Sequence, residues 1–505
     1  MLKIKMKKLY KHQKKQNKEV LKALKQDSHI IYGAATGFGK SVALMHLIAK
    51  DLKKGRKVLV LAPYRKLIFQ LEKTFNAFEP HVIMGTIDRG SKDSGLVLSS
   101  LDTMNARMKK DSPYFEGFHR IYIDEVHIGG AKRMLQLYDK YWNNPMCKWV
   151  GFTATPINAK GYRLEGWDKT IYRYQTRHLI DMGFLADYDY YAPEHMDLSK
   201  LRVSSIGEYV NEDVDEVVST PTAVGSVKKN WKIFGKGKKC IIFAASIKHA
   251  ELLKKAIPDT YIIHSKVNDL AQQKLLEEFA QLKEGTIINV SMLTIGFDDP
   301  SVEVLIYAKP MRSIPLAIQC AGRCLRLFGD KRATIVDLTN VYENAGLPKD
   351  IRDFNRVKKS TDSKKEMNEV AAIQCPHCKE VISKVDVIST KRVTKKMIIV
   401  TKQCPHCEEV IDEIRTDLSI VKSLNKIDDI EVIELSHKER LMELEKLIKS
   451  VTSANTKWAY YILKDIKAND KNDMFDELIG KLKAEYWKPK TIFKKIMELK
   501  DSNET

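Results

Sequence analysis

The sequence predicts an α/β protein with two parallel-sheet domains, followed by a four-cysteine module and a small helical C-terminal region. Two observations predict the sheets: short, almost continuously apolar runs alternate with helix-period patterns, first before residue 190 and again after residue 215. That alternation is typical of buried parallel strands joined by helices. A third observation concerns the tail, where two Cys-x-x-C pairs follow the second series. The chain of 505 residues is expected to form two to four domains, because one core does not grow to that size.

The charge balance favours a polyanionic partner. Lys and Arg number 86 against 65 Asp and Glu, a formal net charge of +21. Such an excess suggests nucleic acid, although a solvated lysine-rich surface has the same composition. The basic N-terminus is not followed by the apolar core of a secretory signal, and no run approaches the ~18 apolar residues of a membrane span. The cysteine usage indicates a reduced, cytoplasmic protein with a metal site and not a disulfide framework.

The first element is a glycine-bearing loop between an apolar run, residues 29–32, and a helix-period pattern. The loop reads Ala34-Ala35-Thr36-Gly37-Phe38-Gly39-Lys40-Ser41. This is the context of a phosphate loop, in which backbone N–H groups and a helix N-terminus face an anion. We expect Lys40 to contact the phosphates of ATP and Ser41 to ligate magnesium. The usual pattern begins with Gly where this chain has Ala34, so an ordinary glycine-rich turn is the alternative.

Tyr10 and Gln13 precede this loop by about twenty residues. The planar amide of Gln13 can pair with the donor and acceptor edges of adenine, with Tyr10 stacking nearby. A solvated glutamine at the start of a helix is the alternative.

Further buried strands are expected at residues 57–63 and 96–98, each ending in polar residues. The carboxyl ends of parallel strands form the ligand-binding edge of a sheet, so hydroxyl and basic groups there could touch a phosphate backbone. Surface turns are the alternative. The candidates are Arg65, Ser99, Ser100 and Thr103.

The strand expected at 121–123 ends in two adjacent carboxylates, Asp124 and Glu125, followed by His127. Asp124 would hold magnesium, and Glu125 would orient or deprotonate the attacking water. The next strand, from residue 149, carries Thr153 and Thr155, whose hydroxyls could relay between the nucleotide and nucleic-acid sites.

After residue 186 the pattern loosens, and an acidic stretch at 208–216 is interpreted as the crossing between domains. The second series then predicts strands at 240–243, 261–263, 286–290 and 304–307. Gln319, Arg323 and Arg326 follow; the arginines at i and i+3 are expected on one helical face, a spacing that suits phosphate recognition. A structural salt-bridge pair is the alternative.

In their order, these motifs resemble the superfamily 2 helicases and translocases, which have two RecA-like domains with ATP between them. The resemblance covers roughly residues 5–345, with Ala34–Ser41 as Walker A and Asp124–His127 as a DExH Walker B. It implies that Gln13 reads adenine and that Thr153 and Thr155, with His127, couple the sites. Arg323 and Arg326, with Gln319, would complete the γ-phosphate site.

The same resemblance assigns further residues. Asp102 stands where a glutamine is commoner in the family. The resemblance implies that Gly296 and Asp298 also contribute to the ATP site. It implies nucleic-acid contacts for Pro63, Ser246, His264, Ser265 and Thr294.

The tail contains Cys375, Cys378, Cys404 and Cys407, with 25 residues between the two pairs. Two repeated knuckles at this spacing predict a zinc ribbon, in which four thiolates bind one ion. The insert between them is expected to form a basic β-ribbon, and it has no His or Asn to suggest an HNH nuclease. A helix beginning near residue 436 precedes aromatic residues interleaved with lysines, which could stack on bases or form a small core.

A helicase-like motor, a ribbon and a helical tail together resemble the RadD-like and phage branch-migration helicases. We therefore expect an ATP-dependent DNA motor that unwinds or branch-migrates forks and junctions, in the cytoplasm of a bacterium or phage-infected host and possibly with replication or recombination proteins. An RNA helicase or RNA-sensing ATPase, and the motor of a restriction or defence nuclease, are the alternatives. The expected parts are domain 1 (1–190), linker (191–215), domain 2 (216–345), linker (346–372), zinc ribbon (373–415) and helical region (416–505).

Overall fold

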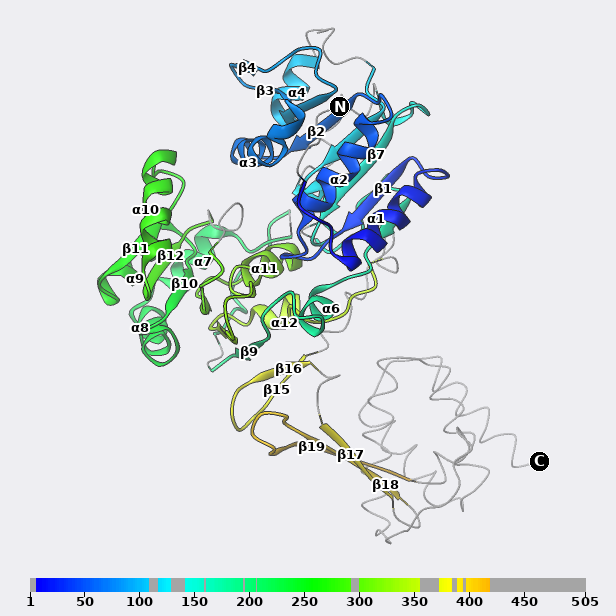
Figure 1. The fold of residues 1–505 in the computed structure, drawn as a ribbon. Helices are drawn as coiled ribbons and strands as arrows, with labels where there is room; N and C mark the ends of the chain where they lie inside the picture. The colour runs from blue at the N-terminus through cyan, green and yellow to red at the C-terminus, as the bar shows by residue number, and fades with distance from the viewer. Residues whose placement is uncertain are drawn as a thin grey trace, which may run out of the picture. The chain divides into compact units, whose positions relative to one another are not determined.

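The computed structural model describes residues 6–108, 117–128, 141–158, 160–193, 196–205, 207–291, 299–354, 372–383, 388–393 and 397–417. The chain divides into two compact units, residues 1–374 with 379–385 and residues 375–378 with 386–505. The first unit holds both large sheets, here called the first and second lobes (Figure 1). Over the described ranges, no helix is long and apolar enough to cross a membrane.

Within the described residues, the sheet of the first lobe has eight strands in the order β4-β3-β5-β2-β6-β7-β1-β8. All neighbours are parallel except β3 and β4. The five predicted strands are present and almost fully buried, as apolar runs in a parallel sheet require. The strands are β1 His29–Gly33, β2 Val58–Ala62, β3 His81–Met84, β4 Ile87–Arg89, β5 Leu96–Ser100, β6 Arg120–Ile123, β7 Lys148–Thr153 and β8 Lys169–Ile171.

Neighbouring strands of this sheet place three motifs side by side. Strands β6, β7 and β1 are adjacent, so Asp124, Thr153 and the loop after Gly33 meet at one carboxyl edge. Helix α2 begins directly after this loop (Figure 1). The helices of the first lobe are α1 Lys11–Ala23, α2 Lys40–Leu52, α3 Arg65–Phe75, α4 Leu101–Met108 and α6 Thr176–Asp181, with short 3-10 turns at Asn76–Phe78 and Val126–Ile128.

In the described part of the second lobe, six parallel strands run in the order β11-β12-β10-β13-β14-β9. The four predicted strands are present, and the prediction of two parallel α/β domains is confirmed. Strand β9 differs from the expected division at residue 190, because it pairs with β14 and so belongs to the second sheet. The bounds are β9 Tyr188–Tyr191, β10 Lys239–Phe243, β11 Thr260–Ile263, β12 Gly285–Asn289, β13 Val304–Tyr307 and β14 Ala333–Asp337.

The acidic stretch that was interpreted as a crossing is partly helical. Residues 211–218 form α7, whose first turn carries Glu212 and Asp213, where the helix dipole favours acidic side chains. The helices of the second lobe are α7 Asn211–Val218, α8 Pro221–Asn230, a π-helical turn Trp231–Gly235, α9 Ile247–Ala256, α10 Asp269–Gln281, α11 Ile314–Ala321 and α12 Val341–Ala345.

The remaining strands are antiparallel. β15 Ala372–Gln374 pairs with β16 Val381–Ser383 in the first unit. In the second unit, β17 Ile388–Val393, β18 Met397–Gln403 and β19 Val410–Asp417 form a three-stranded ribbon between and beyond the cysteine pairs, in line with the predicted β-ribbon. The helical region predicted from residue 416 lies outside the described residues from 418 onward.

Candidate active site

The loop after β1 has the backbone that a phosphate site needs. Gly37 and Gly39 both have positive φ, +86° and +82°, which glycine adopts without strain. Gly39 is also the N-cap of α2, so the N-terminal N–H groups of that helix face the loop. Ala34 is fully buried and its N–H donates to the Thr153 carbonyl (2.8 Å). The unusual alanine is therefore a packed strand end, and the loop beyond it is intact.

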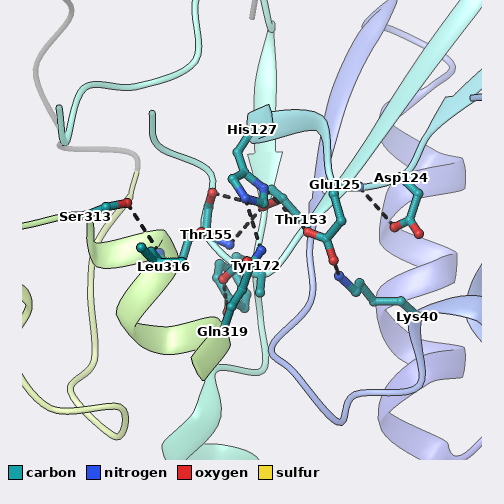
Figure 2. Close-up of polar contacts among 11 residues, drawn as sticks. Lys40, Asp124, Glu125, His127, Thr153, Thr155, Tyr172, Ser313, Leu316 and Gln319 are labelled. Atoms are coloured by element: carbon teal, nitrogen blue, oxygen red, sulfur yellow. Dashed lines mark hydrogen bonds and ion pairs between the residues drawn. The ribbon is translucent and has the colours of Figure 1, made fainter. Parts of the chain in front are cut away.

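Two charged side chains meet at the mouth of this loop. Lys40 Nζ contacts Glu125 Oε1 in an ion pair whose side chains are 19% and 14% exposed (Figure 2). Burial alone would lower the pKa of Lys40, but Glu125 and Asp124 raise it overall. Burial would likewise raise the pKa of Glu125, but the charge of Lys40 and its bond to the carboxylate hold that pKa below its usual range. Both groups are therefore charged at neutral pH.

Asp124 and Glu125 differ in environment. Burial raises the pKa of Asp124 to about 6, and its Oδ1 accepts from the Glu125 N–H (3.1 Å). Glu125 has φ +48°, a left-handed conformation that costs a non-glycine residue energy and occurs preferentially at functional sites. Ser41 lies in the first turn of α2, so the donors at this edge include a hydroxyl and a carboxylate. Such hard oxygen ligands fit Mg²⁺.

A hydrogen-bonded chain continues from His127 (Figure 2). His127 Nδ1 lies 2.8 Å from Thr153 Oγ1 and 3.5 Å from Glu125 Oε2. The Thr153 hydroxyl donates to the Thr155 carbonyl (2.9 Å) and accepts from the Thr155 N–H (3.0 Å). Burial lowers the pKa of His127 to about 4, so the ring is neutral. The Thr153 hydroxyl has one proton and donates it to the Thr155 carbonyl, so toward His127 this oxygen is an acceptor. The proton of the neutral His127 ring is therefore assigned to Nδ1.

The second lobe joins this chain through Gln319. Its Nε2 lies 3.1 Å from His127 Nε2, which is the acceptor nitrogen of the ring, so the Gln319 amide donates. Gln319 is on α11 and is 192 residues from His127 along the chain. The described structure thus brings the last motif of the second lobe onto the DExH sequence of the first.

The residues after α11 correct one expectation. The helix ends at Ala321, Arg323 lies in the following turn, and Arg326 forms an isolated bridge with Leu185. The expectation that the two arginines share a helical face is therefore wrong, because backbone turns at Gly322 separate their directions.

Arg323 nevertheless directly follows the point where the second lobe meets the phosphate loop, at Gly322. Burial lowers the pKa of Arg323, while the charge of Glu125 opposes this shift. A Cβ on Gly322 would lie 2.4 Å from Thr36 Cγ2. The two lobes therefore approach each other closely at this glycine of the second lobe. Burial also lowers the pKa of Arg326.

Gln13 is buried against the phosphate loop. Its Nε2 donates to the Phe38 carbonyl (2.8 Å), and its Oε1 accepts from the Tyr10 N–H (2.9 Å). Tyr10 is 57% exposed and packs on Phe184, with ring centroids 4.8 Å apart. In this arrangement the Gln13 amide holds the phosphate loop.

The first-lobe residues predicted to contact nucleic acid differ in their exposure to solvent. Ser99 and Ser100 are buried, and the Ser100 hydroxyl donates to Thr103 Oγ1 (2.8 Å). Pro63 is buried, whereas Arg65 is exposed at the start of α3.

In the second lobe, Ser246 caps α9 by accepting from the His249 N–H (3.0 Å). His264 is partly buried and Ser265 is exposed. Three further predicted site residues lie outside the described residues: Thr294, Gly296 and Asp298.

The four tail cysteines converge. Their Sγ atoms all lie within 4.8 Å of one another, and the Cys375–Cys407 and Cys378–Cys404 pairs are each 3.7 Å apart. A tetrahedron with Zn–S bonds of ~2.3 Å has edges of about 3.8 Å, so the thiols fit one zinc ion. The knuckle histidines at 377 and 406 are exposed, as expected of residues that are not ligands.

One buried cluster behind the site was missed by the sequence prediction. Asp51 of α2 is 1% exposed and accepts from Arg120 Nε (3.0 Å), Tyr122 Oη (2.7 Å) and Arg56 NH1 (2.7 Å). The bonds from Arg120 and Tyr122 fix helix α2 to strand β6, which Asp124 directly follows. An acidic residue on the apolar face of a predicted helix was the available signal.

Comparison with known proteins extends these observations. Residues 6–158 match the family model "Type III restriction enzyme, res subunit", and residues 227–328 match "Helicase conserved C-terminal domain". A 51.5 kDa protein of Lactococcus phage (isolate 7-9) is 28% identical over 350 residues, covering 68% of this chain and 73% of that protein.

Two more distant relatives agree. The Saccharomyces cerevisiae protein "Putative ATP-dependent helicase IRC3" is 25% identical over 320 residues, 59% of this chain and 46% of the yeast protein, so the chain spans about half of that relative. The fragment structure of a putative HsdR subunit of a type I restriction enzyme from Vibrio vulnificus YJ016 shares the fold, with a TM-score of 0.51 and 22% identity over 66% of this chain and 64% of that chain. The chain therefore belongs to superfamily 2 of the ATP-hydrolysing helicases.

Proposed function

We propose that this protein is an ATP-driven DNA motor that unwinds or branch-migrates forked and junction DNA during replication, recombination or repair. The observation that carries the proposal is the bond from Gln319 to His127. It joins the lobes directly beside Glu125, so a change at the nucleotide can alter how the lobes meet. Lobe movement of that kind is what translocation along a strand requires.

In this proposal each residue of the site has one task. Lys40 contacts the β- and γ-phosphates, Ser41 and Asp124 hold magnesium, and Glu125 activates water. The ion pair between Lys40 and Glu125 must open when phosphate arrives, which releases the carboxylate for its role as base. Arg323 and Arg326 would stabilise the γ-phosphate from the second lobe, and Arg323 directly follows Gly322, which lies against Thr36 of the phosphate loop.

The proposed nucleic-acid contacts are the exposed or partly exposed candidates. Arg65 and Thr103 of the first lobe, with His264 and Ser265 of the second, lie at carboxyl ends of strands or in the turns and helices that follow them. Buried Ser99 would act by supporting this edge, since its hydroxyl is turned to the Ser100 carbonyl (3.3 Å). The net charge of +21 supports a polyanionic substrate.

We further propose that the cysteine cluster of the second unit binds zinc. The two 3.7 Å Sγ separations support this, because they match the edge of a zinc–thiolate tetrahedron. The basic ribbon between the pairs would give a surface for a second duplex arm. Reduced thiols of this kind suit the cytoplasm of a bacterium or a phage-infected host.

A second candidate is the motor subunit of a restriction system. The match of residues 6–158 to a restriction-enzyme family model favours it. In that case DNA cleavage would be supplied by another subunit or segment.

The test is ATP hydrolysis by the full chain with single-stranded DNA, linear duplex, a fork, a four-way junction and RNA at equal nucleotide concentration. The proposal expects the greatest stimulation with forks or junctions, and stimulation that falls steeply as salt rises from 50 to 200 mM. Equal stimulation by linear duplex would favour the restriction motor. Greatest stimulation by RNA would overturn the assignment to DNA.

A further inference from the structure

A short hairpin of the second lobe, described at residues 202–205 and 207–210, lies between the helicase-like motifs of the two lobes and belongs to none of them. Its two sides pair through a bridge between Val203 and Tyr209. The turn is closed by Ser204, whose N–H (2.7 Å) and hydroxyl (2.8 Å) both donate to the Glu208 carbonyl. The Val210 N–H donates to the Arg202 carbonyl (2.9 Å). These bonds join the two described sides of the hairpin, in the stretch that the sequence predicted to be a linker.

The Glu208 side chain reaches the helix that carries Gln319. Its carboxylate accepts from the backbone N–H groups of Arg312 (3.1 Å) and Ser313, immediately before α11. Ser313 is the N-cap of that helix and also accepts from the Leu316 N–H (3.3 Å; Figure 2). A carboxylate is favoured there by the helix dipole as well as by the two bonds. The neighbouring Tyr209 ring lies under the Arg312 guanidinium, 5.5 Å from its centroid.

The tip of the same hairpin touches the first lobe. Gly207 has φ +90°, and a Cβ built there would lie 2.8 Å from Lys160 Cγ and 3.3 Å from Lys160 Cα. Lys160 belongs to the turn that follows Thr155, where the Asn158 side chain accepts from the Lys160 and Tyr162 N–H groups (3.0 Å each). A side chain at Gly207 would thus push against first-lobe backbone.

We propose that the hairpin sides at 203–205 and 207–209 set the position of α11 against the first lobe, and that Glu208 is a positioning residue for ATP hydrolysis. Held at its N-terminus by Glu208, the eight-residue helix delivers Gln319 to His127 and the following turn delivers Arg323. The contact at Gly207 ties the hairpin to the loop that follows Thr155. The inference rests on the roles proposed above for Gln319 and Arg323.

The test measures steady-state ATP hydrolysis by the full chain for Glu208→Ala, Glu208→Gln and Gly207→Ala. Glu208→Ala should lower kcat at least tenfold and change KM for ATP less than threefold, because the phosphate loop is untouched while α11 is released. Glu208→Gln keeps one acceptor oxygen and should recover part of the loss. Glu216→Ala, an exposed change of equal charge on α7, is the matched control and should retain wild-type kcat.

Thermal unfolding of each variant separates positioning from loss of fold. A wild-type kcat in both Glu208→Ala and Gly207→Ala overturns the inference, as does a loss of kcat that only follows loss of folded protein. Combining Glu208→Ala with Gln319→Ala adds a second criterion: the losses should be less than multiplicative, because both act through α11. Losses that multiply would contradict it.

Arg323→Ala distinguishes this inference from the proposed function. If Arg323→Ala is inactive and Glu208→Ala is normal, only the positioning role fails. If Arg323→Ala and Gln319→Ala both hydrolyse ATP at the wild-type rate, the proposed catalytic roles fail first.

Discussion

Replacing Gln319 with alanine should uncouple the lobes without disturbing the nucleotide loop. The change removes the amide that donates to His127 Nε2 at 3.1 Å. The His127 side chain is 7% exposed, so water does not readily replace the lost donor. Leaving a buried acceptor unpaired costs about 1–3 kcal/mol. If the bond is needed in the transition state, kcat should fall by roughly 5- to 150-fold.

The assay is ATP hydrolysis at saturating single-stranded DNA, with Gln319→Ala, His127→Ala and the double variant forming a cycle. A direct bond predicts a coupling energy of about 1 kcal/mol or more, so the double variant should lose less than the sum of the single losses. The exposed Gln273, which bonds Glu277 on the surface of α10, gives the control Gln273→Ala. That control should retain wild-type kcat.

Two results would refute this reasoning. One is additivity of the two single losses within about 0.5 kcal/mol, which would mean that the side chains act independently. The other is a change in KM for ATP with unchanged kcat, which would place Gln319 in ground-state binding and not in the transition state.

Four other changes have defined outcomes. Lys40→Ala should abolish both ATP binding and hydrolysis, whereas Glu125→Gln should bind a fluorescent ATP analogue and not turn over; turnover above a tenth of wild type in either would contradict the assigned chemistry. Gly322→Ala places a methyl group 2.4 Å from Thr36 Cγ2, so it should separate the lobes and lower kcat at least tenfold, and a normal rate would show that this contact is dispensable. Cys404→Ser should reduce the bound zinc of freshly purified protein from one ion per chain to a small fraction, measured by atomic emission; absence of zinc from the wild type would reject the site.

Several features followed from the sequence because they depend on residues close together in the chain. The apolar runs of β1 and β2 identify buried parallel strands, since each position in such a strand needs an apolar side chain. Gly37, Gly39 and Lys40 identify the phosphate loop because its conformation is local. The two Cys-x-x-C pairs predicted that the four thiols converge, since this sequence spacing is typical of zinc ligands.

Other features were decided only by tertiary structure. The sequence placed Arg323 and Arg326 on one helical face, but the end of α11 at Ala321 separates them. It assigned the Gln13 amide to adenine, and the fold adds a bond from that amide to the Phe38 carbonyl, which no local pattern indicates. Whether a polar side chain hydrogen-bonds to the protein's own backbone or remains available to a ligand depends on which segments pack against it.

The remaining contacts of the site join residues that are far apart in the sequence. Gln319 and His127 are separated by 192 residues, and Glu208 and Ser313 by 105. No local periodicity records such pairs, because the first depends on how the two lobes meet and the second on how the second lobe folds. The sequence alone therefore determined the chemistry available to this protein, namely a phosphate loop, paired carboxylates and four thiols. The tertiary structure determined which of these groups face one another, because packing and not sequence distance decides which groups share a site.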